Sequence, residues 1–243
     1  MRMLTFAKRN FKEIVRDPLN LCFIFGFPIV LLLLLSAIQA NIPVSMFEIE
    51  HLSPGIAVFG LAFMTLFSAT LISKDRQSSF MHRLYTTPMK PRDFILGYTL
   101  PLIPIAITEG FATYIFAIIL GLEIKINILL SIVLMIPIAL LYIGIGLLCG
   151  SVLNDKQVGG ICGALLTNLS AWFSGIWFDL DLVGGGFKKI AYALPFVHSV
   201  EMQRAAIAGN FNDILPHLIW VLGYAVVIII IAIYLFLRQM KKQ

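Results

Sequence analysis

The feature of this sequence that most limits its fold is a series of six long stretches almost free of charged residues. A helix needs about 20 apolar residues to cross about 30 Å of hydrocarbon. Strands of a membrane barrel alternate polar and apolar residues, whereas these stretches are continuously apolar. The pattern therefore predicts an all-α integral membrane protein with six transmembrane helices, over residues 19–40, 54–73, 94–122, 126–153, 158–178 and 218–237.

The composition excludes the other broad classes of protein. Of the 243 residues, 59% are hydrophobic and 13% are charged, whereas a soluble domain is about 45–50% apolar and about 25% charged. Disordered chains combine low hydrophobicity with high charge, which is the opposite composition. We expect one transmembrane domain over residues 1–243, organised as a surface helix (1–18), two spans (19–73), a loop (74–93), three spans (94–178), an outer loop (179–217) and a sixth span with a tail (218–243).

Lysine and arginine are distributed unequally between the two sides that six spans would define. Fourteen of the 18 basic residues would lie on the side that carries both termini, and four on the other. Cytoplasmic loops of membrane proteins carry an excess of these residues, so both termini are expected in the cytoplasm. The net charge of +5 is explained by attraction to anionic lipid headgroups, and no nucleic-acid partner is expected.

The N-terminal segment has the pattern of an amphipathic helix. Leu4, Ala7, Phe11 and Ile14 recur at helical spacing, and basic residues cover much of the remaining circumference. Such a helix lies in the membrane interface. A signal peptide is disfavoured, because the following apolar run is longer than the 7–15 residues typical of a signal core.

The loop between the second and third predicted spans has the pattern of a structured surface. Asp75 can cap a helix over residues 76–85, in which apolar and aromatic side chains recur at i, i+4 spacing among cations. This helix is expected to end before Pro88. The loop is suited to docking a cytoplasmic partner, through Asp75, Arg76, Phe80, Met81, Arg83, Leu84 and Pro88.

The loop contains a characteristic series of short segments: Ile72-Ser73-Lys74-Asp75-Arg76, Phe80, Arg83-Leu84, Thr87-Pro88 and Ile95-Leu96-Gly97. In these residues it resembles the cytoplasmic loop of permeases of ATP-binding-cassette transporters of the second type, and especially of their small drug-resistance and antibiotic-export subfamily. The similarity extends over nearly the whole chain. One departure is that the family often has a Gly-Thr pair followed by Glu, where this sequence has Ser78-Ser79 and then His82.

The resemblance implies several partners. In this family the loop is a coupling helix that seats in a groove of a separate ATPase subunit. The expected partners are two copies of a cytoplasmic ABC ATPase, membrane lipids, and a second permease as a homodimer or closely related heterodimer. ATP and Mg²⁺ would bind to the ATPase, and no cofactor is expected on this chain. The resemblance also implies the cytoplasmic membrane of a prokaryote and export of a drug, an antibiotic or a lipid-linked molecule.

No sequence motif in the chain supports catalysis. A phosphate-binding loop Gly-x-x-x-x-Gly-Lys-Ser/Thr is missing, and residues 184–188, the nearest approach, differ in spacing. Neither a His-Glu-x-x-His helix nor a Gly-x-Ser-x-Gly turn is present. We expect no catalytic residue in this chain, so that ATP hydrolysis would have to come from another polypeptide.

Glu109 is the only formal charge inside the six predicted spans. Ionisable groups at membrane depth are costly and by default suggest function. Two interpretations remain open. Glu109 faces a path between two permeases, where it attracts cationic substrate, or it makes a buried hydrogen bond, for example to Asn168.

The outer loop is expected to contain two short helices, over residues 187–193 and 198–209. Pro195 separates them, and Gly209 ends the second. They are too short to cross the membrane, and the family resemblance implies that they re-enter it and close the translocation path. His198 and Glu201 have one-turn spacing, but zinc needs more ligands and no second histidine stands nearby in the sequence, so no metal is expected. The outer residues singled out are Pro195, His198, Glu201 and Arg204.

Prolines and glycines predict the shape and packing of the spans. Pro101, Pro104 and Pro137 interrupt long apolar runs and predict kinks. Two pairs with Gly-x-x-x-Gly spacing, 146/150 and 159/163, allow helices to approach closely.

Other classes of function remain as alternatives. A stand-alone secondary transporter driven by an ion gradient generally has several intramembrane charges and repeated halves, and neither is visible in this sequence. A membrane-embedded scaffold or enzyme is the third class, and the missing catalytic motifs argue against an enzyme. The leading expectation is the permease subunit of an ATP-driven exporter.

Overall fold

The computed structural model describes residues 2–43, 47–78 and 91–240. All regular elements in this part of the chain are helices, and two of them, η1 and η2, are π-helical. The order is α1 (Arg2–Val15), α2 (Pro18–Leu21), η1 (Cys22–Gly26), α3 (Phe27–Gln39), α4 (Ile49–Gln77), α6 (Pro91–Thr99), α7 (Leu102–Ile119), α8 (Asn127–Val152), α9 (Asp155–Val158), η2 (Gly159–Leu166), α10 (Thr167–Trp172), α11 (Leu180–Val183), α12 (Gly185–Ala193), α13 (Pro195–Ala208) and α14 (Phe211–Met240).

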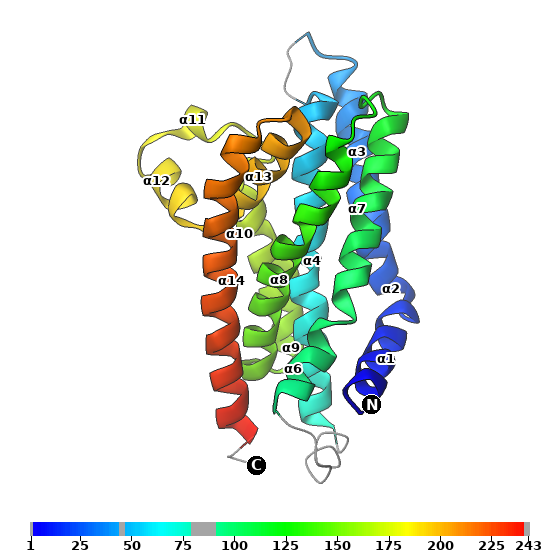
Figure 1. Cartoon of the computed structure of the whole chain (residues 1–243), viewed down its shortest axis with the longest axis vertical. Helices are drawn as coiled ribbons and strands as arrows, with labels where there is room; N and C mark the ends of the chain where they lie inside the picture. Colours follow the sequence, from blue (N-terminus) through cyan, green and yellow to red (C-terminus); the bar gives the residue numbers. More distant parts are fainter. Residues whose placement is uncertain (1, 44–46, 79–90, 241–243) are drawn as a thin grey trace.

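Five helical segments among the described residues are long and apolar enough to cross a membrane. They lie side by side with their long axes roughly aligned (Figure 1). The segments are Pro18–Gln39, Ile49–Gln77, Arg92–Ile119, Asn127–Val152 and Phe211–Gln239. The all-helical membrane fold expected from the sequence is therefore confirmed.

The fifth of the six predicted spans, over residues 158–178, is not among the candidate spans. Helices α9, η2 and α10 follow one another without a gap from Asp155 to Trp172, so the helical part ends before the predicted end of the span at residue 178. Gly175 then has a φ of 71°, a left-handed conformation that glycine adopts without steric cost. The structure thus shows five candidate spans, and the six-span topology stays a prediction.

Helix α4 is the centre of the bundle. Of its most apolar 18-residue window, 89% is buried inside the chain, against 17% for the first and last candidate spans. Two hydroxyl groups of α4 donate to backbone carbonyls of α8: Thr65 Oγ1 lies 3.1 Å from the oxygen of Tyr142, and Ser68 Oγ lies 3.3 Å from that of Ile143. Interhelical hydrogen bonds of this kind fix helix pairs where water is excluded.

The third predicted span is broken near its beginning. Helix α6 ends at Thr99 and α7 begins at Leu102, with turns at Leu100 and Pro101 between them. Proline has no backbone N–H and its ring clashes with the preceding turn, so the kink expected at Pro101 is confirmed. Pro137, by contrast, lies inside α8 without ending it.

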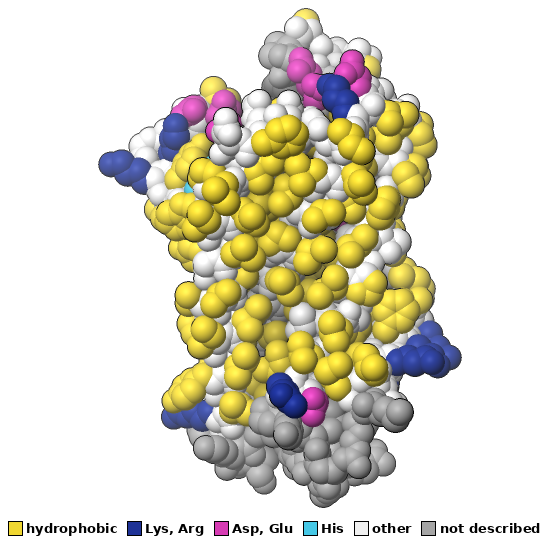
Figure 2. Space-filling view, in the orientation of Figure 1, with side chains coloured by type: hydrophobic (Ala, Val, Ile, Leu, Met, Phe, Trp, Pro, Cys, Tyr) yellow, Lys and Arg dark blue, Asp and Glu magenta, His cyan; other side chains and the backbone are white. Residues whose placement is uncertain are grey.

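The surface matches a protein that sits in lipid. Hydrophobic side chains cover the middle of the visible face, and charged side chains lie toward its two ends (Figure 2). Large apolar residues of α14 such as Ile219, Ile230 and Tyr234 are about 60% exposed, which would be unfavourable in water.

The expected N-terminal helix is present as α1, and it packs against α6. Phe6, Ala7, Asn10 and Ile14 are buried, whereas Leu4 is 63% exposed and Phe11 38%. Of the predicted apolar stripe, Ala7 and Ile14 are therefore covered by the chain itself, and Leu4 and Phe11 are not. Asp17 then caps α2, which begins at Pro18, where proline is favoured.

The two outer-loop helices are close to their predicted positions. Helix α12 ends at Ala193, α13 begins at Pro195, and Gly209, with a φ of 82°, caps α13 in the left-handed conformation. Helix α13 packs against α4, α8 and α14 at the upper end of the bundle in Figure 1. Most of its side chains are buried, so α13 is part of the bundle rather than a surface loop.

Candidate functional site

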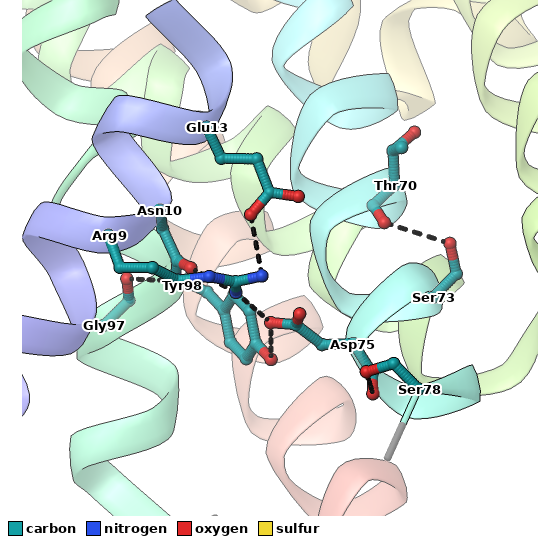
Figure 3. Close-up of polar contacts among 9 residues, drawn as sticks. All are labelled: Arg9, Asn10, Glu13, Thr70, Ser73, Asp75, Ser78, Gly97 and Tyr98. Atoms are coloured by element: carbon teal, nitrogen blue, oxygen red, sulfur yellow. Dashed lines mark hydrogen bonds and ion pairs between the residues drawn. The ribbon is translucent and has the colours of Figure 1, made fainter. Parts of the chain in front are cut away.

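The residue set of greatest interest lies at the lower end of the bundle in Figure 1, where α4 ends and α6 begins. Figure 3 shows the contacts of Arg9, Asn10, Asp75, Gly97 and Tyr98, which we call the Arg9–Asp75 cluster. These residues come from α1, the last turn of α4, and α6. Their positions lie on both sides of residues 79–90 in the chain.

Asp75 is the centre of this cluster. Arg9 Nη1 donates to Asp75 Oδ2 at 2.7 Å, and the hydroxyl of Tyr98 donates to the same oxygen at 2.9 Å. The side chain of Asp75 is 3% exposed and that of Arg9 37%. A buried carboxylate is tolerated when it is paired and hydrogen-bonded, and here both conditions are met by residues of two other helices.

The charge on Arg9 is held by its neighbours. Burial alone lowers the pKa of the guanidinium, but the hydrogen bond and the negative charge of Asp75 outweigh this effect, so that the pKa of Arg9 lies above its ordinary value. Glu13, one turn further along α1, accepts a second contact from Arg9 at 2.8 Å. The guanidinium therefore stays charged and oriented between two carboxylates.

Helix α1 makes a close contact with the backbone of α6. Asn10 Nδ2 donates to the carbonyl oxygen of Gly97 at 3.0 Å. A methyl group at Gly97 would overlap the ring of Phe6, and this ring lies edge-on to Tyr98 with centroids 5.0 Å apart. Gly97 is thus a position where the absence of a side chain allows α1 and α6 to approach.

The prediction that Asp75 caps a separate helix is wrong. Helix α4 continues to Gln77, and the carboxylate of Asp75 points to α1 and α6 instead (Figure 3). Arg76 Nη1 donates to the carbonyl oxygen of Gly150 at 2.7 Å, which satisfies a free carbonyl at the end of α8. Of the predicted docking residues, Phe80, Met81, Arg83, Leu84 and Pro88 lie outside the described residues.

Glu109 is completely buried inside the chain. Its Oε1 accepts a hydrogen bond from Thr113 Oγ1 at 3.0 Å, while Oε2 has no hydrogen-bond partner among the described residues. The carboxylate lies against Gly60 of α4 and near Pro28 of α3. A methyl group added at Gly60 would overlap Oε1 and come within 3.1 Å of Pro28 Cγ.

The hydrogen bond proposed between Glu109 and Asn168 is not formed. Asn168 is exposed, and its Nδ2 donates to the carbonyl oxygen of Ala164 at 2.8 Å. The sequence could not distinguish these partners, because any two polar residues at membrane depth are candidates until the packing of the helices is known.

The outer residues singled out from the sequence are brought together at the upper end of the bundle. Arg204 Nη1 contacts Glu201 Oε1 at 2.9 Å, and its Nη2 donates to the carbonyl oxygen of Gly175 at 3.0 Å. Burial lowers the pKa of Arg204, against the opposing charge of Glu201. Pro195 is the first residue of α13, where it needs no N–H partner.

His198 has a histidine neighbour in space that is not near it in the sequence. His217 of α14 lies next to it, with the two Nδ1 atoms 2.9 Å apart. Within the described part of the chain, no three residues of the types His, Cys, Asp and Glu are grouped so that they could hold a metal ion. The pair was missed because the two histidines are 19 residues apart and lie on different helices.

A second polar network, inside the bundle, was also missed. The amide of Gln203 on α13 donates to the carbonyl oxygen of Ser131 on α8 at 3.0 Å, and its oxygen accepts from the hydroxyl of Tyr114 on α7 at 3.2 Å. Gln203 and Ser131 are fully buried. No clear signal for it was present in the sequence, since Gln203 is one of five polar residues on α13 and their partners depend on how this helix packs.

A comparison with protein families decides the class of the chain. The family described as ABC-2 type transporter matches residues 1–208. The chain belongs to this family. No curated protein matches it. Membership of the ABC-2 family makes the chain a membrane component of a transporter rather than a catalytic subunit, and the family implies an ATPase partner and an oligomeric permease. The Arg9–Asp75 cluster of this ABC-2 protein then flanks the segment that resembles a coupling helix.

Proposed function

We propose that this chain is the permease subunit of an ATP-driven exporter, energised by a separate ABC ATPase that docks on residues 79–90. The observation that carries the proposal is the Arg9–Asp75 cluster. It joins α1 to the end of α4 and the beginning of α6, so that a force applied to the segment between α4 and α6 reaches three helices together. Connections between helices are commonly 2–8 residues long. A loop that only joined two spans could therefore be shorter, and it would not need the Arg9–Asp75 cluster at its two ends.

The proposal includes an assembly and an orientation. Two copies of the permease, identical or closely related, pair with two ATPase subunits, and the path for the substrate lies between the copies, because closed two-fold symmetry is the commonest arrangement of subunits. The end that carries α1 lies in the cytoplasm with both termini, and α9, η2 and α10 together form the sixth span. Helices α12 and α13 close the path on the outer side.

The proposed substrate is amphipathic or hydrophobic: a drug, an antibiotic or a lipid-linked molecule. The candidate spans carry a single charged side chain in their interior, Glu109, and no cation that would neutralise a strongly anionic cargo. Nucleotide binding closes the ATPases, and the docked segment transmits this motion to α4 and α6.

The first test asks whether a reading frame beside the gene of this chain encodes an ABC ATPase. Such an ATPase is then co-expressed with this chain and purified through a tag on the permease to test the docking surface. Phe80→Ala and Leu84→Asp are expected to abolish substrate-stimulated ATP hydrolysis without preventing membrane insertion, because they remove the aromatic and apolar contacts. Gln77→Ala, at the exposed end of α4, is the control and should hydrolyse ATP normally. Normal stimulation in both docking variants would contradict the proposal.

The same assay tests whether the Arg9–Asp75 cluster positions the docked segment. Asp75→Asn keeps the size of the side chain but removes its charge, and Tyr98→Phe removes one hydrogen bond to it. Both are expected to retain the ATPase on purification while stimulated hydrolysis falls several-fold. Tyr234→Phe is the matched control, because the ring of Tyr234 is 63% exposed on α14. Equal hydrolysis in all three variants would leave the cluster a purely structural feature.

The alternative is a stand-alone transporter driven by an ion gradient. The observation that favours this alternative is the buried carboxyl of Glu109, because such transporters place ionisable groups at membrane depth. Proton-dependent uptake by vesicles that contain only the purified chain would favour this alternative, and co-purification with an ATPase together with a requirement for ATP would exclude it.

A further inference from the structure

A second cluster, of histidine and aromatic side chains, lies at the upper end of the bundle in Figure 1, away from the Arg9–Asp75 cluster. It consists of Tyr192, His198, His217, Trp220 and Tyr224, which we call the histidine cluster. Tyr192 belongs to α12, His198 to the first turns of α13, and the other three to α14. The cluster therefore joins the elbow between α12 and α13 to the last candidate span.

Ring stacking holds these residues in one column. The ring of His198 is nearly parallel to that of Trp220, with centroids 4.9 Å apart and an angle of 12°, and Trp220 stacks in turn on Tyr224. The hydroxyl of Tyr224 donates to the carbonyl oxygen of Ala193 at 2.6 Å. The elbow is thus held against α14 by the hydrogen bond of Tyr224, by the stack of His198 on Trp220 and by the contact between the two imidazoles, in addition to the packing of α13 on α14.

The hydrogen bonds assign the protons of the histidine pair. His198 Nε2 lies 3.0 Å from the carbonyl oxygen of Tyr192, and a carbonyl only accepts, so this nitrogen carries the proton. In the neutral ring the Nδ1 of His198 is then the acceptor. It receives the Nδ1–H of His217 across 2.9 Å, which leaves the Nε2 of His217 without a proton.

This arrangement limits how many protons the closed pair can hold. One proton can be added at Nε2 of His217, because its Nδ1 continues to donate. A second proton has only Nδ1 of His198 as its site, and two N–H groups would then face each other at 2.9 Å on two cationic rings. Like charges at this separation repel, and this repulsion opposes the second proton, whereas the negative charges of Glu201 and Asp213 favour it.

The charged and titratable groups near the pair lie on α4, α12, α13 and α14, whereas α8, which also packs against α13 and α14, carries no charged residue. Glu201 and Arg204 lie on α13, Asp213 on α14, His51 on α4, and Lys188 of α12 lies over the ring of Tyr192 at 5.7 Å. Most of these groups, with His217, line a pocket of about 300 Å³, which gives solvent access to His217. Arg204 is already engaged by Glu201 and the carbonyl oxygens of Gly175 and His51.

The surroundings disfavour the second proton at neutral pH. Burial lowers the pKa of His198, the carbonyl of Tyr192 raises it, and the charge of His217 lowers it further, with a smaller opposing effect of Glu201. The folded pKa of His198 is therefore below its ordinary value. Neutral His198 stabilises the contact with His217 fully above about pH 6.5, the ordinary pKa of histidine. This stabilisation is lost as the pH falls through the lower pKa of His198 in the folded chain.

We propose that His198 and His217 form a proton-binding latch that attaches α13 to α14 when it holds at most one proton and releases the elbow between α12 and α13 when it binds a second. The ligand is the proton on the side of the membrane where α13 lies. The latch goes beyond the transport function proposed above and does not depend on an ATPase.

The latch is tested first by the fluorescence of Trp220. In a chain that carries Trp172→Phe and Trp177→Phe, Trp220 is the only tryptophan, and a stacked imidazolium quenches indole emission more strongly than a neutral imidazole. In nanodiscs between pH 8 and pH 5, we expect a step in emission with its midpoint below pH 6.5. His198→Gln should lose this step, and His51→Gln, the control at the same end of the bundle, should keep it.

Movement of the elbow is measured separately by the distance between two nitroxide labels. The labels replace Ile190 on α12 and Val226 on α14, each 54% exposed, in a chain without Cys22, Cys149 and Cys162. We expect a longer distance component at pH 5 than at pH 8, and the loss of this pH response in His198→Gln and in His217→Gln.

Several outcomes would overturn the latch. They are an unchanged distance distribution between pH 8 and pH 5 in the parent chain, or a pH response that persists in both histidine variants. The proposal can still be contradicted if one histidine variant fails to fold. In that case the pH titrations of the parent chain and of the His51→Gln control give the answer. None of these measurements involves ATP, so they are independent of the docking experiment.

Discussion

Glu109 shows how a single charged side chain is accommodated in an apolar bundle. The carboxylate crosses from α7 to α4 and lies where Gly60 has no side chain. Its contact with Thr113 is made within its own helix. Because it is fully buried inside one chain, substrate passing between two permeases would reach it only after α3, α4 and α7 separate.

Substitution at Gly60 is expected to displace this carboxylate. Gly60→Ala overpacks the contact and should lower the free energy of unfolding by about 1–3 kcal/mol, seen as a lower unfolding temperature in detergent. Gly55→Ala is the control on the same helix, because its added methyl would only touch the side chain of Ile176 at 3.3 Å. The double substitution Gly60→Ala with Glu109→Ala should recover part of the loss. No recovery would show that another contact limits Gly60.

Glu109→Gln separates the structural role from the proposed transport role. The amide has nearly the same size, so stability should change little. If Glu109 attracts cationic substrate, transport of cations should fall while transport of neutral compounds is kept. An unchanged substrate profile would remove the transport role and leave the buried contact.

At the residue scale the sequence identified the unusual groups but not their partners. Glu109 was conspicuous as the only charge in an apolar stretch. Asp75 was also identified, but as a helix cap, because the sequence does not show that Arg9, 66 residues earlier, folds back onto it. Partners this far apart depend on tertiary packing, which local patterns do not contain.

At the scale of helices, the contact between α4 and α8 depends on two glycines. A methyl group at Gly146 would come within 2.5 Å of the carbonyl oxygen of Thr65, and one at Gly150 within 2.7 Å of that of Ala69. The atoms approached are backbone atoms, which cannot move without moving the helix. This pair therefore packs helices within one chain.

The two glycine pairs are expected to respond differently to alanine. Gly146→Ala should separate α4 from α8 and lower the free energy of unfolding by about 1–3 kcal/mol. Gly159→Ala, in η2, meets no atom within 4 Å and should be neutral or stabilising, because alanine favours a helix by up to about 1 kcal/mol over glycine. Thermal unfolding of both variants in the same detergent makes the comparison, and equal losses would contradict the packing argument.

The limits of helices were predictable where a residue has one strong conformational preference. Pro195 and Gly209 marked the ends of α13, and Pro101 marked the break between α6 and α7. The π-helical segments η1 and η2 were not predictable, since they keep the composition of an α-helix and differ only in hydrogen-bond register. The contact of α1 with α6 was not predictable either, because it joins residues that are far apart in the sequence.

On the scale of the whole molecule, burial is very unequal between the spans. Helix α4 is enclosed, whereas the first and last candidate spans expose most of their apolar surface. Five spans were evident from the spacing of charged residues, because lipid excludes charge over a fixed thickness. The sixth span, which we propose to consist of α9, η2 and α10, requires an experiment that shows whether this segment crosses the membrane.

This crossing is tested by placing single cysteines at its two ends. In a chain without its native cysteines, Lys156→Cys should react with a membrane-impermeant maleimide from the same side as Gln77→Cys. Leu182→Cys, at a position 79% exposed, should react from the same side as Ile124→Cys, at one 81% exposed. The 18 helical residues from Asp155 to Trp172 would span about 27 Å as an α-helix, close to the hydrocarbon thickness. Labelling of Lys156→Cys and Leu182→Cys from one side would leave five spans.

The central position of α4 also has a consequence for synthesis of the protein. The hydroxyls of Thr65, Ser68 and Ser73 donate hydrogen bonds to residues that follow them in the chain by 75 to 82 positions. At about 5–20 residues per second, the ribosome needs on the order of ten seconds to make those partners. During this time α4 is already in the membrane with its inward face bare, so we expect the insertion machinery or a membrane chaperone to retain it until α8 emerges.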